Sequence, residues 1–138
     1  MIYFVGAGSG APDLITVRGA RLLSEADVIV YAGSLVNPAH LRACKPGCVC
    51  LDSASMNLGE QVGAMSAAAL EGKRVVRLHT GDPAMYGAIN EQIRGLAEKG
   101  VGASIVPGVS SVFAAAAALG CELTCPDGSQ SVVLTRTP

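Results

Sequence analysis

Short apolar runs alternate with stretches of helical spacing along the chain. The apolar runs predict five strands, over residues 2–5, 28–31, 49–51, 74–78 and 103–106. A helix is predicted after each strand, over residues 16–24, 38–43, 58–71, 88–99 and 112–119. Most strands are apolar without polar alternation, which is typical of strands buried on both faces. The pattern predicts an α/β fold: a mainly parallel five-stranded sheet with helices on both faces.

Two of the predicted helices carry more specific expectations. The first should begin at Asp13 or Thr16 as its N-cap, with Val17, Ala20, Leu22 and Leu23 on its buried face. The last contains the alanine run 114–118, whose small side chains allow close packing against the sheet.

The periodic pattern ends after Thr124. We expect residues 1–124 to form one α/β domain and residues 125–138 to be a linker and the first strand of a second domain. That strand is predicted over residues 131–135. A lone strand cannot bury both of its faces, so it needs further elements to pair with.

Composition and charge indicate a small molecule as the partner. The 138 residues are 50% hydrophobic and 15% charged, which is enough for one globular core. Ten basic and eleven acidic residues give a net charge of -1, so no broad basic surface is expected for nucleic acid or anionic lipid. Aromatic residues are 4% of the chain, which disfavours base stacking.

The amino terminus and the cysteines indicate a reducing compartment. Residues 1–5 run straight into glycines, with neither a basic leader nor a long apolar stretch, so the cytoplasm is expected. The five cysteines are an odd number, which favours free thiols. The spacing of His40, Cys44, Cys48 and Cys50 matches neither a zinc ribbon nor an iron–sulfur motif. We therefore expect no metal site there, only small buried side chains.

The segment from Arg77 to Gly87 is the strongest candidate for a ligand site. Its turn, residues 80–83, breaks the apolar run, so the segment should lie at the carboxyl end of a strand, where open α/β sheets bind ligands. The loop at residues 6–11 has the relaxed spacing of a dinucleotide motif. The second strand, however, ends without the acid that would contact a ribose, which disfavours a nicotinamide-dependent oxidoreductase.

Three ordered motifs resemble the tetrapyrrole (corrin and porphyrin) methylase family. They are V-G-A-G-S-G-A-P-D-L-I-T at residues 5–16, T-G-D-P at residues 80–83 and V-P-G-V-S-S at residues 106–111. Residues 31–36, 52–56 and 77–83 are most similar to members that methylate a ring carbon in cobalamin biosynthesis. Family members are longer, so the resemblance covers their amino-terminal half.

The resemblance implies an S-adenosylmethionine-dependent methyltransferase of two α/β domains. It implies a cofactor in the cleft between the domains, a tetrapyrrole in an adjoining trough, and a homodimer. By motif position, the implied cofactor contacts are Ser9, Thr80, Gly81, Asp82, Met85, Ser110 and Ser111. The candidate substrate contacts are Gly8, Gly10, Ser34, Ser53, Met56 and His79. The family usually has proline where this chain has Ser9, and no catalytic base is identified.

The residues themselves leave alternatives open. Asp82 either accepts a hydrogen bond from a ribose hydroxyl or amino group of a ligand, or it shapes the turn before Pro83. His79 is either a ligand contact or a structural hydrogen-bonding residue. Three functions stay open. They are methylation of a corrin precursor, the reaction of another tetrapyrrole methylase (including one acting on a uroporphyrinogen), and ligand binding without turnover.

Overall fold

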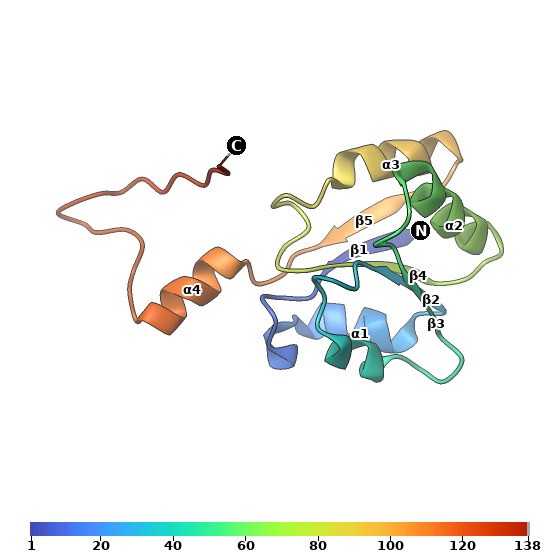
Figure 1. Ribbon diagram of the computed structural model, residues 1–138, viewed down its shortest axis with the longest axis horizontal. Helices are drawn as coiled ribbons and strands as arrows, with labels where there is room; N and C mark the ends of the chain where they lie inside the picture. Colours follow the sequence, from blue (N-terminus) through green and yellow to red (C-terminus); the bar gives the residue numbers. More distant parts are fainter. Residues whose placement is uncertain (138) are drawn as a thin grey trace.

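The computed structural model describes residues 1–137 and contains a five-stranded parallel sheet between two layers of helices (Figure 1). The strand order is β3-β2-β4-β1-β5, and every neighbouring pair is parallel. The predicted α/β sheet is therefore confirmed. In chain order the elements are β1 (Ile2–Gly6), the 3-10 helix η1 (Pro12–Leu14), α1 (Val17–Glu25), β2 (Val28–Tyr31), the 3-10 helix η2 (Pro38–Ala43), β3 (Val49–Asp52), α2 (Leu58–Leu70), β4 (Val75–His79), α3 (Ile89–Glu98), β5 (Ala103–Val106) and α4 (Ser111–Leu119).

Side chains of each central strand alternate between two apolar clusters, one on each face of the sheet. On one face, Phe4 of β1 and Val75 of β4 pack with Val62 of α2. On the opposite face, Val5 of β1 packs in a cluster with Leu23 of α1. Figure 1 shows α2 and α3 on one side of the sheet and α1 on the other. Both faces are buried, which explains why the strands are apolar without alternation.

The start of α1 confirms one prediction and corrects another. The Thr16 hydroxyl accepts a hydrogen bond from the Gly19 N–H at 3.0 Å, so Thr16 is the N-cap. Val17 is 89% exposed, contrary to the expected buried face. Leu22 and Leu23, in the last turns of the helix, are buried against the sheet, as predicted.

The topology reverses between β1 and β4, which are hydrogen-bonded neighbours. The chain leaves β1 toward α1 on one face of the sheet and leaves β4 toward α3 on the other face. The loops that follow the two strands therefore lead to helices on opposite faces of the sheet. A crevice at such a switch point is where open α/β sheets bind ligands.

Helix α4 extends away from the sheet, so the expected close packing of its alanine run is wrong (Figure 1). Phe113 is 65% exposed and Leu119 is 79% exposed, and only Ala116 of this helix is buried. Alanine side chains bury little apolar area, so they attract a helix to a sheet only weakly. Both faces of the sheet are already covered by the other helices.

Residues 121–137 form turns and irregular chain, and the strand predicted over residues 131–135 is not formed. This segment pairs with no strand among residues 1–137, and an isolated strand is not stable in water. The domain boundary at residue 124 stays a prediction. Within the described chain, no helix has the length and apolar character required to span a bilayer.

Candidate functional site

The backbones of three loops meet at the carboxyl end of the sheet. The Gly8 N–H donates to the Gly81 carbonyl at 3.2 Å, and the Gly81 N–H donates to the Gly8 carbonyl at 2.7 Å. A Cβ atom on Gly6 would lie 2.6 Å from the Gly81 carbonyl oxygen and 2.7 Å from the Gly108 Cα. Only glycine allows backbones to approach this closely. The loops after β1, β4 and β5 therefore form one tightly packed junction.

Asp82 fastens the loop after β4 to the loop after β5. Its Oδ2 accepts a hydrogen bond from the Gly108 N–H at 2.9 Å, and its Oδ1 accepts one from the Ala84 N–H at 2.8 Å. The carboxylate thus shapes its own turn and also fixes the neighbouring loop. Each carboxylate oxygen can accept a further hydrogen bond, so the geometry is compatible with a ligand contact as well.

A cavity of about 390 Å³ opens beside this carboxylate, and we call it the Asp82 cavity. Its lining is mainly apolar and consists of Asp82, Ala84, Met85, Gly108, Val109, Ser110, Phe113 and Leu134. The volume and the small number of polar groups are typical of sites for small organic molecules.

A smaller cavity of about 170 Å³ shares Met85 with the first, and we call it the Arg77 cavity. It is lined by Ala32, Leu35, Arg77, Leu78, His79, Thr80, Met85, Tyr86 and Gly87. The loop after β4 therefore separates two neighbouring cavities, one on the side of β5 and one on the side of β2.

Arg77 is a buried cation whose hydrogen-bond partners are side-chain amides. Its Nε donates to the Gln92 Oε1 at 3.1 Å, and its Nη2 donates to the Gln61 Oε1 at 3.2 Å, while Nη1 has no partner among residues 1–137. Burial lowers the pKa of the guanidinium to about 10, so it is still charged at neutral pH. A buried charge with an unused donor is costly unless it serves a ligand.

His79 lines the same cavity as a neutral side chain. Its ring stacks on Phe4 with the centroids 5.8 Å apart. Burial, and then the charge of Arg77, lower the pKa of His79 to about 4, so the imidazole is neutral at pH 7. Its Nε2 has no hydrogen-bond partner in the described chain. A cation and a neutral imidazole, each with an unused polar atom, therefore border one cavity.

The loop that carries these cavities is locally strained. Tyr86 and Ala88 have φ angles of 55° and 48°, in the left-handed region that non-glycine residues rarely adopt. Between them, Gly87 has no room for a side chain, because a Cβ would collide with the Pro83 carbonyl. Such strain is concentrated at functional sites, which agrees with the position of this loop between two cavities.

Four of the seven expected cofactor residues line the two cavities. Asp82 and Ser110 border the Asp82 cavity, Thr80 borders the Arg77 cavity, and Met85 borders both. Gly81 lies in the glycine junction, and a Cβ built on it would lie 3.9 Å from the Ser111 backbone nitrogen. The remaining two residues, Ser9 and Ser111, line neither cavity but adjoin residues that form the junction or the lining.

The six expected substrate residues are less well grouped. His79 lines the Arg77 cavity, and Ser34 is exposed beside Leu35, which also lines it. Gly8 belongs to the glycine junction. The Gly10 carbonyl accepts a hydrogen bond from the Asn37 side chain at 2.8 Å.

The other two substrate candidates have structural contacts instead. The buried Ser53 hydroxyl donates to the Tyr31 carbonyl at 3.0 Å, so it is already satisfied within the protein. The Met56 carbonyl accepts a hydrogen bond from Gln61, and Met56 lines neither cavity. Neither residue meets the other candidates at the cavities.

Several lining residues were not among the expected contacts, although Arg77 opens the segment that the sequence singled out as a candidate site. Arg77 had a usable signal, because a charged residue inside the apolar run V-V-R-L-H implies a buried partner or a function. Phe113 and Leu134 had no such signal. They reach the Asp82 cavity only because α4 turns away from the sheet and residues 121–137 remain irregular.

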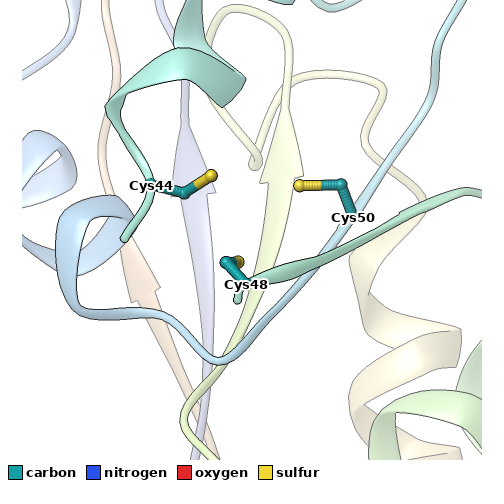
Figure 2. A group of neighbouring side chains, drawn as sticks. All are labelled: Cys44, Cys48 and Cys50. Atoms are coloured by element: carbon teal, nitrogen blue, oxygen red, sulfur yellow. The ribbon is translucent and has the colours of Figure 1, made fainter. Parts of the chain in front are cut away.

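The cysteines are all free thiols, as predicted. Cys44, Cys48 and Cys50, however, lie together, with their sulfur atoms all within 4.8 Å of one another (Figure 2). His40 is buried separately from this group, and burial lowers the pKa of its imidazole.

Strand order, switch point and the cavities beside it define a doubly wound α/β domain with a candidate small-molecule site at the carboxyl ends of its strands. The family model of the tetrapyrrole (corrin/porphyrin) methylases matches residues 1–138. The chain belongs to this family, as its three motifs predicted.

Curated relatives agree with this assignment. The chain is 58% identical over 135 residues to cobalt-precorrin-4 C(11)-methyltransferase of Priestia megaterium, covering 98% of this chain and 52% of the relative. It is 51% identical over 135 residues to precorrin-4 C(11)-methyltransferase of Pseudomonas aeruginosa, covering 98% of this chain and 54% of the relative. The chain thus spans about half the length of the relatives it matches.

Solved structures show the same fold. A cobalamin biosynthetic enzyme, cobalt precorrin-4 methyltransferase, superposes with a TM-score of 0.97 at 57% identity, covering 99% of this chain and 57% of that one. Uroporphyrin-III C-methyltransferase from Thermus thermophilus, in complex with S-adenosyl homocysteine, gives a TM-score of 0.78 at 33% identity, covering 94% of this chain and 52% of that one.

Proposed function

We propose that this chain is the amino-terminal half of an S-adenosylmethionine-dependent methyltransferase that methylates carbon 11 of precorrin-4 or cobalt-precorrin-4 in cobalamin biosynthesis. The observation that carries the proposal is the Asp82 cavity, because the loops after β4 and β5 that line it contain two of the three family motifs. The names of the relatives supply the substrate and the ring carbon.

The Asp82 cavity fits the chemistry of S-adenosylmethionine. The cofactor combines apolar and polar parts, and the lining offers apolar surface together with the Asp82 carboxylate and the Ser110 hydroxyl. Gly108 exposes backbone at the cavity, which allows close approach of a flat ring. When bound, the cofactor supplies an activated methyl group, while the residues of this chain orient it and exclude water.

Arg77 and His79 suit the acidic side chains of a tetrapyrrole. A guanidinium recognises carboxylates, and the neutral imidazole can add one further hydrogen bond. We therefore propose that the Arg77 cavity receives an edge of the substrate, next to the cofactor. Met85, which borders both cavities, would lie between the two ligands.

Calorimetry with S-adenosylhomocysteine tests the cofactor site. Ala84 is an exposed residue that lines the Asp82 cavity, so Ala84→Trp fills the cavity without disturbing the core. We expect binding to weaken at least about tenfold, which corresponds to about 1.4 kcal/mol. The matched control is Ala118→Trp on the exposed side of α4, which should bind like the parent chain. If Ala84→Trp also binds S-adenosylhomocysteine like the parent chain, the Asp82 cavity is excluded as the cofactor site.

Methyl transfer tests the reaction. The full-length protein is incubated with labelled S-adenosylmethionine and defined precorrins, and the labelled ring carbon is located by NMR. Label at carbon 11 of precorrin-4 or its cobalt form is expected. Label at another carbon, or on a uroporphyrinogen, would replace this proposal with another tetrapyrrole methylase. Tight S-adenosylhomocysteine binding without any transfer would make the chain a binding module.

The assembly and the compartment are part of the same proposal. The family resemblance implies a homodimer, and the five free thiols fit a reducing compartment such as the cytoplasm. Light scattering on the purified chain would measure the mass of the assembly, and a monomer at all concentrations would contradict the homodimer.

A further inference from the structure

Three cysteine side chains converge beside the edge strand of the sheet (Figure 2). Cys44 is the C-cap of η2, Cys48 is the last residue of the turn at residues 45–48, and Cys50 is the second residue of β3. Cys48 and Cys50 are two residues apart in extended chain, so their side chains lie on the same face. The turn contains Gly47 at a φ of 82° and brings Cys44 back toward them.

The three thiols form a donor set that contains only sulfur. Among residues 1–137, this is the one group of three or more histidine, cysteine or acidic side chains with ligand atoms close enough to share an ion. Their sulfur atoms are all within 4.8 Å of one another. With metal–sulfur bonds of about 2.3 Å, a trigonal site holds its sulfurs about 4 Å apart, so small side-chain rotations would complete it.

From this geometry we propose that Cys44, Cys48 and Cys50 form a binding site for one soft cation, represented by Cu(I). Thiolate ligands select soft ions, and three of them complete a trigonal shell for Cu(I). A structural zinc ion takes four protein ligands, and the described group supplies three. The site is separate from the proposed cofactor and substrate sites, because none of its residues lines either cavity.

The three thiols lie in a partly apolar environment. They are half-buried and pack against the apolar cluster under α1 and η2. Burial, and then the neighbouring sulfurs, raise the pKa of Cys48 to about 12, and burial raises that of Cys50 as well. The thiols of Cys48 and Cys50 are therefore neutral at pH 7 when no ion is bound. Each sulfur–copper bond that forms releases the proton of that thiol to solvent.

A bound ion would join η2 to an edge strand. Among residues 1–137, β3 pairs with β2 alone, so it is an edge strand of the sheet. Cys44 comes from the end of η2, whereas Cys50 belongs to β3, so a shared ion links the two elements directly. An ion that binds the folded chain and not the unfolded chain raises the melting temperature.

Anaerobic titration of the full chain with Cu(I), against a coloured Cu(I) chelator, tests the proposal. We expect one ion per chain, a thiolate-to-metal absorption band and a higher melting temperature. Cys50→Ala should weaken binding by about 100-fold or more, because it removes a ligand. The matched control replaces both exposed tail cysteines, in the double variant Cys121→Ala/Cys125→Ala, and should bind like the parent.

Alkylation of the unmodified chain decides the question even if Cys50→Ala fails to fold. Iodoacetamide labelling with and without Cu(I), read by peptide mass spectrometry, should show protection confined to Cys44, Cys48 and Cys50. Cys121 and Cys125 should react equally in both samples. Unchanged labelling of the three clustered cysteines at saturating Cu(I), or loss of binding in the tail variant, would overturn the proposal.

Discussion

Replacing Asp82 by alanine tests whether its carboxylate holds the site together. The two hydrogen bonds of this carboxylate, to the N–H groups of Gly108 and Ala84, are 2.9 Å and 2.8 Å long. A hydrogen bond to a charged group contributes about 1.5–3 kcal/mol, and the exposed one to Ala84 is at or below the low end of this range because water competes for it. Asp82→Ala also leaves the partly buried Gly108 N–H without its acceptor. We therefore expect a loss of about 2–3 kcal/mol in the free energy of unfolding.

Urea denaturation followed by circular dichroism measures this loss. For a chain of this size, about 2–3 kcal/mol corresponds to a fall of roughly 6–10 °C in melting temperature. The matched control is Asp127→Ala, which removes an exposed acid in the carboxyl-terminal segment and should change stability by less than about 0.5 kcal/mol. If Asp82→Ala is as stable as this control, the two hydrogen bonds of Asp82 contribute nothing to the free energy of unfolding, and the reasoning from them is refuted.

Two further predictions concern the junction and the buried histidines. Gly6→Ala should lower the free energy of unfolding by about 3 kcal/mol, because its Cβ would collide with the backbones of Gly81 and Gly108. Gly63→Ala in α2 places its Cβ in open space and should raise the free energy of unfolding by about 1 kcal/mol through helix propensity. Urea denaturation of both variants measures the two effects separately. His79 has a pKa of about 4 in the folded chain against 6.5 when unfolded, so between these values the unfolded chain binds a proton that the folded chain does not. Stability should therefore fall as the pH drops from about 6.5 to 4, by at most about 3 kcal/mol from His79, with His40 acting in the same direction. His79→Gln should flatten this pH profile, and an unchanged slope would exclude His79 as its cause.

The strands and helices up to β5 could be predicted from the sequence because apolar runs and helix-capping residues are local signals. An apolar run such as residues 28–31 and a capping residue such as Thr16 act within a few residues of themselves. The three glycine-containing loops were recognisable for the same reason, since their turn residues are adjacent in sequence.

Features that depend on tertiary contacts were not predictable in this way. The alanine run in α4 is compatible with packing on a sheet or with extending from it, and no local pattern distinguishes these arrangements. The cysteine cluster depends on the turn that returns Cys44 toward β3, so its spacing in sequence matches no familiar motif. Arg77 was readable as an anomaly in an apolar strand, but its amide partners on α2 and α3 come from distant parts of the sequence.

The position of α4 makes stability and ligand binding at the Asp82 cavity inseparable for some variants. This helix packs on neither face of the sheet, so its placement depends on the short segment that joins it to β5. Asp82 fixes that segment through the Gly108 N–H, and Ser110 and Phe113, which follow it, line the cavity. Asp82→Ala should therefore weaken S-adenosylhomocysteine binding even if the carboxylate never touches the ligand. Ala84→Trp leaves both hydrogen bonds of Asp82 in place, because the bond from residue 84 uses its backbone N–H. A loss of binding in Ala84→Trp without a loss of stability would thus locate the cofactor in this cavity. A loss of binding in Asp82→Ala alone would show only that the two hydrogen bonds of Asp82 hold the loops in place.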